Sequence, residues 1–199
     1  MKQIVLAVLV LVYLAGCATR SVSNTPRTAV EQLILSTAID TALSKFQLPE
    51  VAGKKLYVDF TNLKGYDAEY VKVAVRARFA EIGATLADKP EQAEFIAEIA
   101  SGCIGNEYKS FIMGIPALPI PGSAVPMPEL ALYRDVEQTG IVKFLIFVHA
   151  NGNLVALDQY YARADRNESF LLWFRSQRKD QIRESWERAD LELKQKTLR

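Results

Sequence analysis

The thiol of Cys17 has the clearest chemical context in this sequence. Ile4 to Tyr13 form an almost unbroken apolar run after the positive start Met1-Lys2-Gln3, and Leu14-Ala15-Gly16 place small residues just before the cysteine. A positive start, an apolar stretch and small residues at a cleavage point are the layout of a secretory signal peptide. We therefore expect residues 1–16 to be removed, so that the mature chain begins at Cys17.

Leu14-Ala15-Gly16-Cys17 resembles the bacterial lipobox, in which the cysteine receives a diacylglycerol on its thiol and an acyl chain on the new amine. The resemblance implies covalent lipid on Cys17, which makes the bilayer a partner, and no other cofactor is expected. The alternative is an uncleaved membrane anchor, but the apolar run is shorter than the roughly 20 residues that span a hydrocarbon core. Inner-membrane lipoproteins of Gram-negative bacteria usually carry Asp after the cysteine. Ala18 therefore resembles the outer-membrane pattern, with the protein on the periplasmic face.

Residues for other chemistry are few. His149 is the chain's one histidine, and we expect it to be a strand-end residue. Cys103 would be the remaining thiol, and we expect it to be an inert cysteine in the core. No His-Glu-x-x-His, Gly-x-Ser-x-Gly, Cys-x-x-Cys or phosphate-binding glycine loop occurs, so neither an enzyme nor a metal site is predicted. A cleft with paired carboxylates, or with His149 against an acid, would instead indicate a hydrolase.

Composition narrows the class of partner. Lys and Arg number 24 against 23 Asp and Glu, so no basic field favours nucleic acid. Half the residues are hydrophobic, and a mature chain of about 180 residues has the size of one domain with appendages. An envelope protein partner remains open, as does the oligomeric state.

Hydrophobic periodicity predicts an α+β domain over residues 26–166, after a tether over 17–25. The expected fold is a single small, mainly antiparallel sheet of three to five strands with two helices on one face. One helix would begin at Thr25-Pro26 and end before Pro49, and the other would run from Asp67 to Ile82 with Gly83 as its stop. Strands are expected near residues 54–61, 84–87, 94–104, 130–133, 140–150 and 154–162. The last two would be joined by a hairpin turn at Asn151-Gly152.

From residue 167 the pattern predicts a charged helical tail to residue 199. Phe170-Leu171-Leu172-Trp173-Phe174 concentrate apolar surface there, either as core packing or as an interface. A basic cluster follows, which either meets lipid headgroups or lies on a solvated helix face: Arg175, Arg178, Lys179 and Arg183.

Residues 113–128 form a proline-rich, uncharged segment that contains five of the chain's eight prolines. Proline lacks the amide donor that a central strand or helix needs, so an extended loop is predicted. Its apolar side chains would cover the protein's own sheet or would contact something else. The candidate interaction surface consists of Ile115, Pro116, Leu118, Pro119, Ile120, Pro121, Val125 and Met127.

Several short patterns together resemble an uncharacterised family of bacterial lipoproteins. The likeness covers most of the mature chain to about Ala150 and implies no activity, substrate or catalytic residue. It rests on Thr25-Pro26-Arg27-Thr28-Ala29-x-Glu31-Gln32, Ser36-Thr37-Ala38-x-Asp40, Thr61-Asn62-Leu63-x-Gly65-Tyr66-Asp67-x-x-Tyr70-Val71, Gly114-Ile115-Pro116-x-x-Pro119-x-Pro121 and Pro128-Glu129-Leu130-Ala131-Leu132.

These observations predict a membrane-anchored periplasmic lipoprotein with a non-catalytic binding or scaffolding role in the cell envelope. The alternative is a binder of an apolar ligand such as lipid or glycolipid, which a deep apolar pocket beneath residues 113–128 would favour. A hydrolase is the third possibility.

Overall fold

The computed structural model describes residues 18–21, 27–119, 122, 127, 129–172 and 174–197. The helices are α2 (Ala29–Leu43), α3 (Ala68–Ile82) and α4 (Gln181–Thr197), with short 3₁₀ helices at Pro49–Val51 and Pro90–Gln92. The strands are β1 (Ala18–Ser21), β2 (Lys55–Asp59), β3 (Thr85–Leu86), β4 (Phe95–Ile115), β5 (Leu130–Ala150), β6 (Asn153–Leu171) and β7 (Phe174–Asp180). No helix within these residues is long and apolar enough to cross a membrane.

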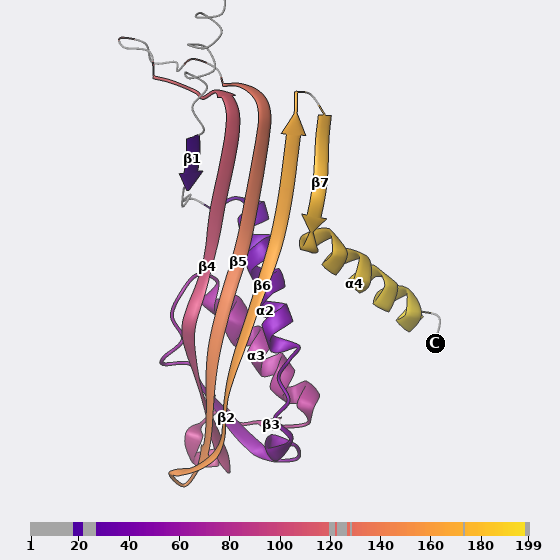
Figure 1. The fold of residues 1–199 in the computed structure, drawn as a ribbon. Coiled ribbons are helices and arrows are strands. Elements are labelled where there is room, and N and C mark those ends of the chain that lie inside the picture. The colour runs from indigo at the N-terminus through magenta and orange to yellow at the C-terminus, as the bar shows by residue number, and fades with distance from the viewer. Residues whose placement is uncertain are drawn as a thin grey trace, which may run out of the picture. The chain divides into compact units, whose positions relative to one another are not determined.

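The strands form one mixed sheet in the order β3-β2-β4-β5-β6-β7, with β1 paired to β4 (Figure 1). β2 is parallel to both β3 and β4, whereas β1 is antiparallel to β4 and β7 is antiparallel to β6. The predicted small, mainly antiparallel sheet of three to five strands with two helices is therefore wrong. The described residues contain a larger mixed sheet and three helices.

The strands run further than their sequence pattern indicates. Residues 105–115 and 134–139 continue β4 and β5, although they show no alternation of apolar and polar residues. Side chains at 134–138 are all half-buried. Neither face of the sheet is buried enough there to require an apolar residue at every second position. The helix expected from residue 167 is also wrong up to Asp180, because β6 and β7 form a hairpin there and α4 begins only at Gln181.

Contacts divide the chain into two compact units, and β4, β5 and β6 contribute residues to both. Among the described residues, unit 1 contains 18–21, those of 107–138, and those of 166–180. Unit 2 contains 27–106, 139–165 and 181–197. In unit 2, α2 and α3 share one apolar core with β2, β4, β5 and β6. Phe46, Phe79 and Phe144 are among its largest fully buried side chains.

Local signals place the ends of several elements in unit 2. Gly83 ends α3 with a φ of 100°, as predicted. Asn151 and Gly152 have φ values of 50° and 79°, which confirms the predicted tight turn between β5 and β6. The cap of α2 is corrected, because Thr28 rather than Thr25 precedes the helix. Thr28 and Glu31 form a reciprocal capping box there.

Candidate functional site

The described residues of the predicted interaction surface lie at one end of unit 1. Ile115 is the last residue of β4, and Ile115 and Leu118 are both about half exposed. The amide of Met127 donates to the carbonyl oxygen of Leu118 across 2.8 Å, which brings the two sides of the segment together. Pro116 and Pro119 lie on either side of Leu118 in the chain. Ile120, Pro121, Val125 and the predicted lipidation site Cys17 lie outside the described residues.

Neighbouring strand ends add apolar side chains to this surface. Leu172 donates its amide to the carbonyl of Leu132 across 2.8 Å, and Leu171 pairs with Phe174 at the β6–β7 turn. The side chain of Phe174 is 73% exposed. We call the exposed set the apolar end: Met113, Ile115, Leu118, Leu130, Leu132, Leu171, Leu172 and Phe174.

Sequence reasoning singled out the loop but not the whole apolar end. From sequence alone, the apolar run at residues 170–174 fitted either core packing or an interface. The exposure of Leu171, Leu172 and Phe174 shows that these three side chains are not core. The contiguous apolar run was the one signal in sequence, but a run of this length fits a buried helix segment as well as a strand.

Gly114 allows β4 and β5 to approach closely at the apolar end. Its φ is 149°, and a Cβ at this position would lie 2.2 Å from the carbonyl oxygen of Leu130. Only glycine tolerates both the backbone conformation and the contact. The close approach keeps the exposed side chains of the two strands together.

β1 brings the start of the predicted mature chain to the same place. Ala18 pairs with Ile112 on β4, and Ser21 pairs with Lys109. Cys17 immediately precedes Ala18 in the chain. One peptide bond therefore joins the predicted lipidation site to a residue that pairs with β4 beside the apolar end. Sequence reasoning assigned these residues to a tether, whereas 18–21 form a strand.

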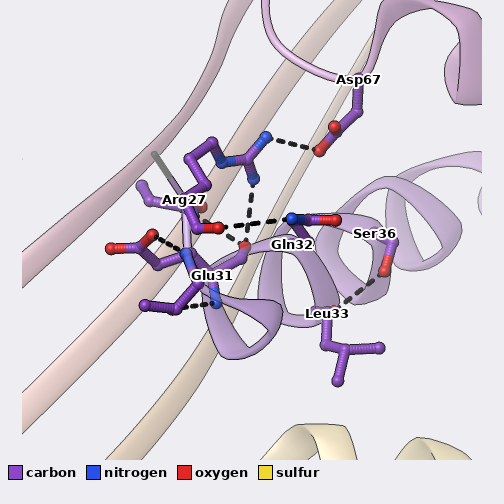
Figure 2. A network of polar contacts seen from close by, with 8 residues as sticks. Arg27, Glu31, Gln32, Leu33, Ser36 and Asp67 are labelled. Atoms are coloured by element: carbon purple, nitrogen blue, oxygen red, sulfur yellow. Dashed lines mark hydrogen bonds and ion pairs between the residues drawn. The ribbon is translucent and has the colours of Figure 1, made fainter. Parts of the chain in front are cut away.

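A second set of residues, in unit 2, forms a polar network around Arg27 (Figure 2). Nη1 of Arg27 donates to Oδ2 of Asp67 at 2.8 Å, and Nη2 donates to the carbonyl of Glu31 at 3.2 Å. The guanidinium also lies 5.2 Å from the ring centroid of Tyr66. Asp67 occupies the N-cap position of α3, as predicted, but its side chain makes no cap hydrogen bond and pairs with Arg27 instead.

The network joins three elements that are distant in sequence. The carbonyl of Glu31 on α2 also accepts a hydrogen bond from Asn106 on β4 at 2.8 Å. The side chain of Glu31 is buried and accepts from the amide of Thr28 at 2.7 Å. The contacts tie the start of α2 to β4 and to the loop before α3. A charged pair with these partners is typical of a structural clamp.

The loop between β2 and α3 is held by similar contacts. The hydroxyl and amide of Thr61 both donate to the carboxylate of Asp59, at 2.6 and 2.8 Å, and they lower the pKa of that carboxyl. Ser101 bonds both the amide and the carbonyl of Lys64. The contacts fix the backbone that presents Tyr66 and Asp67 to Arg27.

Replacement of Arg27 by Ala should lower the free energy of unfolding by about 2 kcal/mol, because a largely buried charged pair loses one partner. Arg27→Lys should recover only part of the loss, because an ammonium group cannot make both contacts. Urea denaturation measures the difference, with the exposed Arg76→Ala on α3 as the matched control. A loss in Arg27→Ala no larger than in Arg76→Ala would show that the network does not stabilise the fold.

The sequence matches the model of a family of unknown function, DUF6655, over residues 11–153. The chain belongs to this family. The predicted resemblance to an uncharacterised family is thereby confirmed at that level. No curated protein matches the sequence.

The DUF6655 match covers the Arg27 network and most strands of the sheet, and it ends at the turn between β5 and β6. It therefore includes Ile115, Leu118, Leu130 and Leu132 of the apolar end. β7 and α4 follow the matched region. Ile182 of α4 is nevertheless buried in the core of unit 2, and α4 packs against α2.

His149 lies at the end of β5, as expected, whereas Cys103 departs from its expected environment. Nε2 of His149 lies 3.2 Å from Oε1 of Glu98, its ring stacks on Phe147, and its Nδ1 is buried without a hydrogen bond. His149 thus does face an acid, but in the part of the chain that the structure describes no hydrogen bond joins it to a nucleophile. Cys103 is exposed rather than in the core, so that prediction is wrong.

Unit 2 also contains a pocket of about 220 Å³ beside β2. Tyr57 and Phe60 line it together with the charged Arg76 and Asp88, so it is not the deep apolar pocket expected for a lipid ligand. The residues that line this pocket belong to unit 2, whereas the described residues within 113–128 belong to unit 1. Within the described residues, no group of three His, Cys, Asp or Glu could hold a metal ion.

Proposed function

We propose that this DUF6655 protein is a cell-envelope lipoprotein, anchored through acyl chains on Cys17, with a non-catalytic binding or scaffolding role. In a Gram-negative host its place would be the periplasmic face of the outer membrane. The proposal takes the lipid bilayer as a partner and residues 113–128 as part of the contact surface.

One structural observation carries the proposal. The pairing of Ala18 with Ile112 brings the first residue after Cys17 to an end of unit 1 where several large apolar side chains are exposed. A lipid-modified cysteine needs an apolar environment for its acyl chains, and a soluble protein seldom exposes an apolar patch of this kind without a use for it. Acylation at Cys17 would account for both features.

Physical magnitudes support a stable anchor. Each buried methylene contributes about 0.8 kcal/mol, so a single acyl chain binds reversibly, whereas two or more give durable attachment. A fully processed lipoprotein cysteine carries three chains. The mature protein would therefore remain membrane-bound without a membrane-spanning helix.

Cys17→Ser should accumulate as an uncleaved precursor without acyl label, because the serine hydroxyl does not replace the thiolate as acceptor. Incorporation of labelled palmitate, together with the size of the product, measures both effects in cells. Cys103→Ser is the matched control, because it removes the other cysteine and should leave labelling and cleavage unchanged. Normal palmitate incorporation into Cys17→Ser would contradict the proposal.

A further inference from the structure

We infer that the apolar end of unit 1 inserts into the interfacial layer of a lipid bilayer and so provides a second attachment beside the acylated cysteine. The inference rests on the proposed function, because it takes the membrane to be where the acyl chains of Cys17 lie. It assigns a role to side chains on β4, β5, β6 and β7 that the anchor alone does not use.

Covalent geometry limits where the membrane can be. Consecutive Cα atoms are about 3.8 Å apart, so Cys17 is within that distance of Ala18, the residue paired with Ile112. Met113 and Ile115, both exposed, follow on the same strand. Acyl chains attached at Cys17 would therefore bring a bilayer to these partly exposed apolar residues.

The apolar end has a depth that suits an interface. Ile112 to Ile115 covers three strand steps, on the order of 10 Å at about 3.4 Å per residue. Interfacial segments bury their apolar face about 5–10 Å into the boundary between headgroups and acyl chains. Three contacts between neighbouring strands place their apolar residues at a similar depth. They join Gly114 with Leu130, Leu132 with Leu172, and Leu171 with Phe174.

Charged residues are scarce at the apolar end, where Glu129 beside Leu130 is the one acid among the described residues, and they become frequent inward from it. The chain carries no Asp, Glu, Lys or Arg from Ser110 to Pro128. Inward from the end, Arg175 pairs with Glu168 at 2.6 Å. Glu129, the one acid beside Leu130, lies 3.5 Å from Nη1 of Arg134, so its charge is also paired. From the outer end of the strands inward, mainly apolar residues are followed by charged residues. A bilayer has the same order, with acyl chains followed by headgroups.

Tyr133 lies at the boundary between the apolar and the charged residues, next to Leu132 on β5. Tyr108 lies further inward on β4, between Glu107 and Lys109. Arg178 donates to the hydroxyl of Tyr133 at 3.0 Å, and the Tyr133 ring lies 6.3 Å from that of Phe111. Tyr108 accepts a longer hydrogen bond from Arg134. Rings with an apolar body and a hydrogen-bonded tip are enriched where proteins meet the headgroup region.

Spin-label accessibility in reconstituted vesicles tests the inference. The full protein, extracted from cell membranes with its native N-terminus and placed in phosphatidylethanolamine–phosphatidylglycerol vesicles, would carry one label at Leu132→Cys or Phe174→Cys in a Cys103→Ser background. Leu157→Cys, exposed on β6 in unit 2, is the control position. Relative to the control, labels at 132 and 174 should gain accessibility to oxygen and lose accessibility to a water-soluble nickel complex.

The mass of the N-terminal peptide from the same sample separates the two proposals. If Cys17 is acylated and the labels at 132 and 174 are as accessible to nickel as the control, the inference is overturned while the lipoprotein proposal stands. Low accessibility to both reagents would indicate contact with a second copy and would also overturn it. An unmodified Cys17 would overturn the lipoprotein proposal, and the inference with it.

Discussion

Gly140→Ala should lower the free energy of unfolding by about 3 kcal/mol, since the new methyl group has no space. A Cβ at Gly140 on β5 would lie 2.7 Å from the carbonyl oxygen of Ile34 and 3.2 Å from the Cα of Leu35. Both atoms belong to the backbone of α2, which cannot move away as a flexible side chain would. The helix and the strand would have to separate, and the core between them would loosen.

Urea denaturation followed by circular dichroism measures the loss. Gly105→Ala is the matched control, because it also lies in a strand of unit 2 but has no atom within 4 Å of the position that its new methyl group would take. Its stability should change by less than about 0.5 kcal/mol. If Gly140→Ala and the wild-type protein unfold at the same midpoint concentration of urea, the close packing of α2 on β5 is contradicted.

Phe46→Ala should cost about 4 kcal/mol, the usual range for removal of a fully buried aromatic side chain. Phe46 is 0% exposed, and its ring centroid lies 4.1 Å from that of Tyr160 and 6.3 Å from that of Phe79. Its loss would leave a cavity among α3, β6 and the segment after α2. A loss of about 4 kcal/mol is a large share of the roughly 5–15 kcal/mol that stabilises a typical domain, so the variant should melt at a clearly lower temperature than the wild-type protein.

Phe174→Ala is the matched control for this prediction. It removes the same side chain from an exposed site on the apolar end, so the free energy of unfolding in solution should change little. Thermal melting of both variants checks the contrast. A Phe46→Ala variant that melts with Phe174→Ala would show that Phe46 is not a core residue.

Short-range signals in the sequence predicted parts of unit 2 correctly. Gly83 and the pair Asn151-Gly152 require positive φ, which few other residues accept, so their positions are legible from sequence alone. The alternation over Lys55–Asp59 likewise predicted β2. The cap of α2 was missed although Thr28-x-x-Glu31 is a capping-box pattern, because Thr25-Pro26 also fits a helix start.

The size of the sheet was not predictable in the same way. The outer parts of β4 and β5 lie in unit 1, where side chains at 134–138 are all half-buried and where apolar and polar residue types do not alternate along 107–115. Phe170-Leu171-Leu172 form a contiguous apolar run, which suits a helix as well as a strand end. Only strand pairing distinguishes the two.

The candidate site was predicted in part for a related reason. Ile115 and Leu118 stand out because a charge-free, proline-rich segment is unusual in sequence. Leu132 and Leu172 join them only through pairing between strands that are far apart in the chain. For the same reason, the ion pair of Arg27 and Asp67 was not predicted. Forty residues separate the two, and neither has a local pattern that indicates the pairing.

The central claim is that the acylated N-terminus and the apolar end contact one membrane. Photo-crosslinking in living cells tests it most directly, with a photoreactive residue placed in turn at Ile115, Leu118 and the control Leu157. The account predicts phospholipid adducts at 115 and 118 and none at 157. A discrete protein adduct at 115 and 118 without lipid would contradict it, and would instead identify the apolar end as a docking surface for an envelope protein.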